Sequence, residues 1–191
     1  MKRMPTSTIT GTALLLALGV VLPVVFHMMP FGGRIFLPMH IPAFLAGLIL
    51  GPVSGLVVGV GSPIMSGLIT GRPTVLYMVP MIFELGTYGL VVGFLRPWFA
   101  RVMQPTETKE IGYTPTLLAL IAAMVIGRAV WLVVVVWLAP LLGINARTPA
   151  LALGALGAGW IGMAIHIAIL PALVRALERA RVSRLRPTIS Q

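Results

Sequence analysis

Six long apolar segments follow one another along the chain, and they constrain its fold more than any other feature. They cover residues 8–29, 35–50, 53–68, 75–95, 115–138 and 149–173. A helix needs roughly 20 apolar residues to cross a hydrocarbon core of about 30 Å, because each residue adds about 1.5 Å. Hydrophobic residues make up 58% of the chain and charged residues 9%, too few to cover a soluble globule of this size. An integral membrane protein is therefore expected, and the same numbers exclude a disordered chain.

The segments predict an all-α membrane protein, a single domain over residues 1–191 built as a bundle of six transmembrane helices. The second and third segments are short and are separated only by Gly51 and Pro52. Glycine suits the end of a helix and proline the first turn of the next, so we expect two antiparallel helices joined by a tight turn. One long kinked helix through this region is the alternative, and it would leave an odd number of spans.

The basic residues set the expected orientation of the six helices. With a cytoplasmic N-terminus, the cytoplasmic segments hold ten of the 14 Lys and Arg residues: Lys2, Arg3, Arg96, Arg101, Lys109, Arg175, Arg179, Arg181, Arg184 and Arg186. The outer loops hold Arg34, Arg72 and Arg147. The positive-inside rule then places both termini in the cytoplasm. The basic tail, residues 174–191, is expected to lie against anionic lipid as an amphipathic extension, and no nucleic-acid partner is expected.

Two ionisable residues are expected within the membrane, where such groups are costly and usually functional. Glu84 is the only acid in any span, and it lies about 15 Å from the outer end of the fourth helix at about 1.5 Å per residue. Arg128 in the fifth helix lies about 10 Å below the outer surface by the same count. The depths agree within about one helical turn, which predicts an ion pair. A purely structural pair and a substrate-binding pair both remain open.

The fourth helix carries two stripes of different character. One stripe is aromatic and acidic and recurs at i, i+4, i+7 and i+11: Tyr77, Met81, Glu84 and Tyr88. The other is made of small residues that allow close helix contact: Gly86, Gly89 and Gly93. A further ladder of small residues runs through the second and third segments: Gly47, Gly51, Gly55 and Gly59. We expect the glycines to pack on neighbouring helices and the aromatic stripe to face a cavity; plain packing in the bundle is the alternative.

Other polar and aromatic residues are expected around a pocket that opens to the outside. Together with Glu84, Arg128, Tyr77 and Tyr88, they complete the candidate substrate-binding set: Arg34, His40, Trp131, Asn145 and Trp160. Each of them alone also has an ordinary explanation, such as a residue of the membrane interface. Trp160 is expected near mid-membrane. His166 is expected deeper, as a packed residue and not as a ligand.

No constellation of residues predicts catalysis, a metal site or a cofactor. The chain has no cysteine, which excludes disulfides and thiolate chemistry. Its three histidines lack metal-ligand spacing, and there is no P-loop or nucleophile elbow. An intramembrane serine protease using Ser66 and His166 is a minor alternative, since Ser66 lacks the usual glycine context.

Three specific motifs lie between Leu37 and Gly93: PMHIP at 38–42, AGLILGP at 46–52 and FELGTYGL at 83–90. In this stretch, and in its six expected helices, the chain resembles the substrate-binding (S) components of energy-coupling factor (ECF) vitamin transporters. The resemblance implies a vitamin pocket facing outward, lined by helices four to six and covered by the first outer loop, residues 30–37. It also implies a bacterial plasma membrane and a toppling motion that releases the cargo.

The resemblance further implies partners that supply the energy, because the chain has no ATP-binding motif of its own. These are a transmembrane coupling subunit and two ATPase subunits. The AxxxA step of the first helix, Ala13 and Ala17, would contact the coupling subunit.

The outer arginines and histidines favour a carboxylate-bearing vitamin such as pantothenate, folate or biotin, with pantothenate as the first guess. Glu84 could instead pair with a cationic or amide-rich substrate. The main alternative function is a stand-alone channel or secondary carrier in which Glu84 and Arg128 form a relay.

Overall fold

The computed structural model describes residues 5–28, 36–103, 111–141, 143 and 159–185, and each regular element among them is helical. The elements are α1 (Thr6–His27), α3 (His40–Leu45), the π-helical η1 (Ala46–Leu50), α4 (Pro52–Thr70), α5 (Val75–Met103), α6 (Tyr113–Val133), the π-helical η2 (Val134–Leu138), α7 (Ala139–Leu141) and α9 (Trp160–Leu185). Five helices are long and apolar enough to span a membrane, and the helix over His40–Leu50 is shorter. The expected all-α membrane architecture is confirmed.

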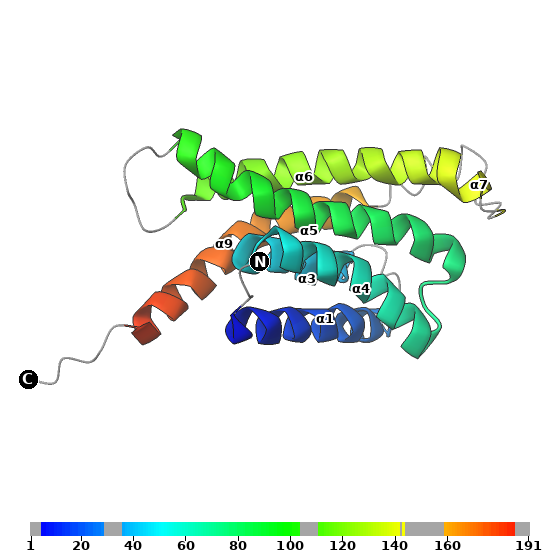
Figure 1. Ribbon diagram of the computed structural model, residues 1–191, viewed down its shortest axis with the longest axis horizontal. Helices are drawn as coiled ribbons and strands as arrows, with labels where there is room; N and C mark the ends of the chain where they lie inside the picture. Colours follow the sequence, from blue (N-terminus) through cyan, green and yellow to red (C-terminus); the bar gives the residue numbers. More distant parts are fainter. Residues whose placement is uncertain (1–4, 29–35, 104–110, 142, 144–158, 186–191) are drawn as a thin grey trace, which may run out of the picture.

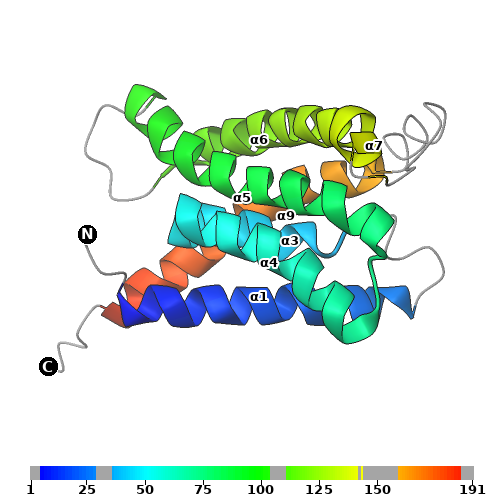
Figure 2. The same ribbon diagram turned by 45° about the vertical axis from the view of Figure 1, so that its right-hand side comes forward.

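The helices form one bundle, in which α4 and α5 make the most extensive contact. In Figures 1 and 2, α1 lies on one side, α5 and α6 lie on the other, and α3 and α4 lie between them, while α9 crosses the bundle obliquely. The start of α1, the end of α5, the start of α6 and the end of α9 lie at one end of the bundle. We call this the basic end, because Arg96, Arg101, Arg175 and Arg179 belong to its helix segments.

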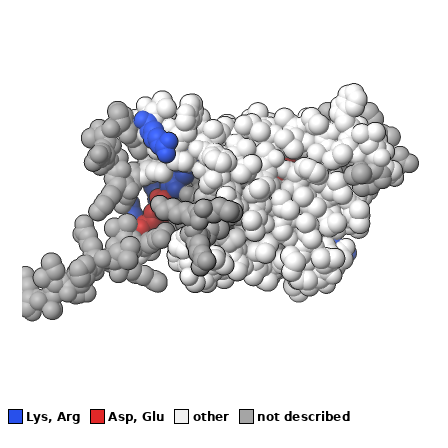
Figure 3. All heavy atoms as spheres, in the orientation of Figure 1, with Lys and Arg blue, Asp and Glu red and all other residues white. Residues whose placement is uncertain are grey.

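The surface view agrees with a membrane-embedded body. Figure 3 shows that the charged atoms of the described residues gather at the basic end, while the rest of that face is almost uncharged. Large apolar side chains such as Leu14, Val125 and Ile161 are more than half exposed along the helices. Such side chains are stable in lipid and would be costly in water.

A tight turn joins the short second helix to α4, as the sequence predicts, and there is no single kinked helix. Gly51 has φ 100°, a conformation that favours glycine, and Pro52 occupies the first turn of α4. A Cβ atom added at Gly55 would lie 2.8 Å from Cα of Gly47, so the two arms of the hairpin touch. Both of these glycines also pack against the backbone of Gly89 in α5.

The glycine stripe of α5 packs on this hairpin, which confirms the prediction. Gly89 lies against the backbone of Gly55, and a Cβ atom on Gly93 would lie 2.6 Å from Cα of Pro52. Gly86 is close to the side chains of Val60 and Leu56. In lipid, where van der Waals packing drives helix association, such close approach is a main source of stability. It also fixes which face of α5 is left for the polar residues.

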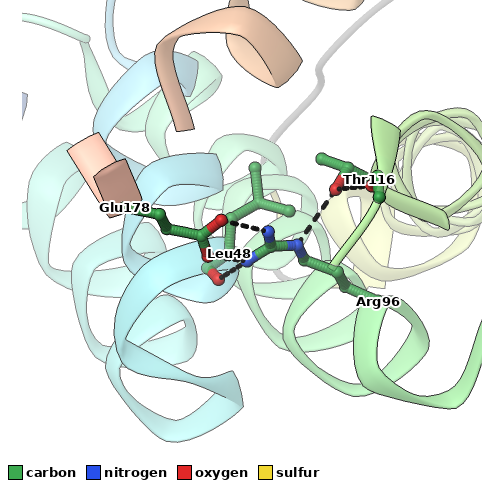
Figure 4. A network of polar contacts seen from close by, with 5 residues as sticks. Leu48, Arg96, Thr116 and Glu178 are labelled. Carbon is green, nitrogen blue, oxygen red and sulfur yellow. Dashed lines mark hydrogen bonds and ion pairs between the residues drawn. The ribbon is translucent and has the colours of Figure 1, made fainter. Parts of the chain in front are cut away.

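A buried arginine ties four elements together at the basic end (Figure 4). Nη1 of Arg96 donates to the carbonyl of Leu48 in η1 at 2.7 Å, and Nε donates to Oγ1 of Thr116 in α6 at 3.0 Å. Nη1 and Nη2 pair with the carboxylate of Glu178 in α9 at 2.8 and 3.0 Å. Only 3% of Arg96 is exposed, so these bonds satisfy a charge that burial would otherwise penalise. The network holds the end of the hairpin, α6 and α9 in one arrangement.

Three expected helix boundaries were wrong. The second helix begins at His40 and not at residue 35, because Pro38 disfavours helical backbone at the preceding Leu37, which has φ 46°. The fourth continues past residue 95 to Met103, with Pro97 inside it. The sixth continues past residue 173 to Leu185, where the bond from Glu178 to Arg96 fixes the start of the expected tail to the bundle. Residues 149–158 of that segment lie outside the described residues.

Candidate functional site

Glu84 and Arg128 form the ion pair that their depths predict. Nη1 of Arg128 lies 3.0 Å from Oε1 of Glu84, and the two side chains are 16% and 3% exposed respectively. The same carboxylate oxygen accepts a hydrogen bond of 2.8 Å from the hydroxyl of Tyr88, one turn along α5. Removing these charges from water is costly, and the mutual pairing offsets that cost. A carboxylate, a guanidinium group and a phenol are therefore held together in the apolar interior of the bundle.

Two glycines make room for this cluster. Gly127 of α6 lies directly against the ring of Tyr88, and Gly159 at the start of α9 lies directly against Nη2 of Arg128. A Cβ atom at either position would collide with the side chain that it faces. The close approach of α5 to α6, and of α6 to the start of α9, thus depends on the absence of a side chain at these two positions.

Two histidines extend the cluster: His40 of α3 lies next to Tyr88, and His166 of α9 lies next to His40. The ring centroid of His40 is 5.5 Å from that of Tyr88 and 6.1 Å from that of His166. Phe44, one turn after His40, stacks on Tyr88 at 4.9 Å and lies 6.1 Å from His166. The exposed fractions of His40 and His166 are 4% and 1%. We call Glu84, Tyr88, Arg128, His40 and His166 the polar centre.

None of the four imidazole nitrogens in the polar centre has a hydrogen-bond partner among the described residues. The backbone of Leu37 lies near His40 and that of Phe36 near His166, but neither has the geometry of a hydrogen bond. The site predicted from the sequence lacks His166, because counting along the expected helices placed it below the other candidates. Its position beside His40 depends on the packing of α9 against α3, which no pattern in the sequence marks.

The chain just before α3 reaches the polar centre without being helical. Pro38 and Met39 are buried, and the Leu37 side chain lies 3.7 Å from the position of a Cβ atom on Gly159. Irregular backbone at membrane depth is tolerated only where protein buries it or where it lines a cavity. These residues follow the expected lid, residues 30–37, of which only Phe36 and Leu37 are among the described residues.

Of the remaining sequence candidates, two are exposed, one packs in a separate cluster and two lie outside the described residues. Tyr77, in the first turn of α5, is 47% exposed, and Trp160, the first residue of α9, is 68% exposed. Trp131 is buried, but it packs with Val135 and Leu132 in a cluster of its own. Arg34 and Asn145 lie outside the described residues.

The minor catalytic alternative gains no geometric support. The Ser66 hydroxyl donates to the carbonyl of Arg72 at 2.7 Å, so it is engaged in the turn between α4 and α5. Ser62 likewise donates to the carbonyl of Val58 within its own helix. Across the described part of the chain, no group of three or more His, Cys, Asp or Glu residues could hold a metal ion.

Comparison with known families adds an independent finding to this geometry. The family described as "ECF transporter, substrate-specific component" matches residues 7–178 of the chain. The chain belongs to this family. No curated protein matches the chain, and no solved structure does.

Membership makes the protein an S component, the substrate-binding part of an ECF transporter and a multi-pass membrane protein. S components belong to transporters and are not enzymes, and they associate with the membrane and ATPase subunits of an ECF module. The function expected from the resemblance is thereby confirmed at this level, and membership speaks against the stand-alone channel or carrier.

The S component presents one face of α1 to its surroundings. Ala13 and Ala17 are exposed there, one helical turn apart. The opposite face packs on the hairpin: Gly19 lies against Ser62, and the Thr12 hydroxyl donates to Oγ of Ser54 at 2.9 Å. The two alanines are therefore free of contacts that the bundle itself would need.

Proposed function

We propose that this S component captures a vitamin or related micronutrient from outside the cell and holds it at the polar centre. The observation that carries the proposal is the set of charged and polar side chains gathered from α3, α5, α6 and α9 inside an otherwise apolar bundle. Intramembrane ionisable residues usually mark a substrate or ion path. Because the family consists of substrate-binding components, substrate binding is the role that we propose for this cluster.

The depth of the polar centre suits a captured ligand. Glu84 lies about 14 Å along α5 from Val75, and His40 lies about 16 Å along its helix from Gly51, at about 1.5 Å per residue. From both distances we expect the cluster near the middle of a hydrocarbon core of about 30 Å. A small molecule bound there is shielded from both aqueous sides.

Pantothenate is the first candidate ligand. Its carboxylate matches the arginines expected near the outer side, since guanidinium groups bind carboxylates through two parallel hydrogen bonds (bidentate binding). We propose Glu84, Tyr88, Arg128 and His40 as inner contacts, and Trp131, Trp160, Tyr77, Arg34 and Asn145 as residues nearer to the entrance. Folate and biotin are the other carboxylate-bearing candidates.

We further propose that both termini lie in the cytoplasm of a bacterial cell and that the protein sits in its plasma membrane. The basic end then faces inward, as the positive-inside rule requires. A transmembrane coupling subunit would dock on Ala13 and Ala17 of α1, and two ATPase subunits would supply the energy. Because the chain has no cysteine, single cysteines at Arg72 and Arg101 can report which end is labelled by an impermeant maleimide.

The test is to identify what the protein retains on purification. The chain is extracted in mild detergent, and its small-molecule content is analysed by mass spectrometry. We expect one vitamin-type molecule in near-stoichiometric amount from the wild type, and much less from Arg128→Ala. Arg101→Ala, exposed at the basic end, is the matched control and should retain it. Absence of any retained molecule, together with no binding of added pantothenate, folate or biotin, would contradict the proposal.

A further inference from the structure

The histidine pair of the polar centre has hydrogen-bonding capacity that the protein does not use. Nδ1 and Nε2 of both His40 and His166 are buried and unpaired among the described residues. The great majority of buried polar side-chain atoms in proteins have a partner, so four unpaired nitrogens in adjacent rings call for an explanation. Lipid cannot supply the missing partner, because it offers no hydrogen-bonding groups at this depth.

The position of the pair points to a ligand. His40 is the first residue of α3, directly after the buried non-helical residues 37–39, and His166 comes from α9 on the other side. Tyr88 links the pair to Glu84 and Arg128 through its ring and its hydroxyl. A molecule that enters past residues 36–39 therefore meets the imidazoles and the ion pair together.

The charges of the polar centre decide which chemistry the pair can accept. Glu84 and Arg128 compensate each other at 3.0 Å, so a charged group placed beside the histidines would stay uncompensated in the membrane. A neutral imidazole offers one N–H donor and one acceptor nitrogen. The matching partner is an uncharged group that both donates and accepts.

We propose that His40 and His166 bind the innermost, uncharged end of the substrate, an amide, lactam or hydroxyl group, and that they determine specificity for it. The inference rests on the proposed function. A charged end of the same substrate, such as a carboxylate, would remain on the outer side of Arg128. A metal ion is not the occupant, because the described residues provide no third ligand of the usual kinds.

The experiment replaces each histidine by leucine, which removes the nitrogens and leaves an apolar side chain of moderate size. His40→Leu, His166→Leu and the wild type are purified, and the retained small molecule is quantified by mass spectrometry. We expect retention to fall at least about tenfold in both variants, as the loss of hydrogen bonds in a buried site implies. His27→Leu, at the exposed end of α1, is the matched control for a histidine outside the polar centre.

A second readout separates binding from folding. Replacing an unpaired buried polar group by an apolar one should not destabilise the protein, so the ligand-free variants should unfold at or above the temperature of the ligand-free wild type. His166→Gln, which keeps a donor and an acceptor, should restore part of the retention.

Full retention in both leucine variants would overturn the histidine assignment while leaving the proposed function standing. A retained molecule without an uncharged donor and acceptor group would overturn the ligand class. Lower melting temperatures of the ligand-free leucine variants would show a structural role and would also overturn it. If the wild type retains nothing and binds none of the three vitamins, the proposed function fails, and this inference fails with it.

Discussion

Glu84 holds two partners at once, Arg128 at 3.0 Å and the Tyr88 hydroxyl at 2.8 Å, in a side chain that is 3% exposed. The sequence alone predicts this pairing, because the depths of two intramembrane charges can be counted along their helices. The histidine pair could not be found in the same way, since it depends on how α3 packs against α9, which cannot be counted along one helix.

The first prediction concerns Arg128→Ala, which leaves the Glu84 carboxylate buried without its cation. Breaking a buried pair on one side typically costs about 3–5 kcal/mol, so both the melting temperature and ligand retention should fall. The double variant Glu84→Gln, Arg128→Ala removes the orphaned charge and should recover most of the stability. If Arg128 contacts the substrate, retention stays low in the double variant. Recovery of retention along with stability would show that the pair is only structural.

Close backbone contact holds η1, α4 and α5 in a fixed register. The hairpin of η1 and α4 packs on α5 through glycines that touch backbone to backbone, and the Arg96 network fixes the same hairpin to α6 and α9. The small-residue spacing predicts the first of these contacts. The Arg96 network could not be predicted from the sequence, because Glu178 belongs to a basic segment that was expected to leave the bundle as a tail. Gly51 forms the expected turn but does not act as a packing residue of the small-residue ladder, since a Cβ atom added to it would meet nothing within 4 Å.

The second prediction therefore compares two glycine-to-alanine changes. In Gly55→Ala the new methyl group meets backbone atoms of Gly89 and Gly47, which cannot move aside, and such overpacking costs about 1–3 kcal/mol. In Gly11→Ala the nearest atom is the end of the flexible Leu50 side chain at 3.1 Å, and alanine also favours the helix. Thermal unfolding in detergent should show a clear loss for Gly55→Ala and little change for Gly11→Ala. Equal effects of the two changes would refute this account of the packing.

In the described part of the chain the molecule has a polar centre, a basic end and, on α1, an exposed outer face that carries Ala13 and Ala17. Residues of α1 on that face, among them Ile9, Leu14 and Val21, are more than half exposed. Lipid alone could cover them, but a transporter component also needs a surface for its membrane partner. The family identifies the need for such a partner, and the small side chains of Ala13 and Ala17 permit another helix to approach closely.

The third prediction places two bulky side chains on that surface. Ala13→Leu with Ala17→Leu should prevent co-purification with the coupling and ATPase subunits while ligand retention by the isolated chain stays unchanged. Ala172→Leu, an exposed alanine of α9, is the control and should leave the complex intact. A complex that forms normally with both α1 substitutions would exclude this face as the docking site.

The most direct test of the central claim is uptake into liposomes of the molecule that the purified chain retains. The chain alone should bind that molecule without transporting it. Uptake should begin only when the coupling subunit and both ATPase subunits are added together with ATP, and it should fall with Arg128→Ala. Uptake by this chain alone, without ATP or partners, would contradict its assignment as a substrate-binding component that depends on others for energy.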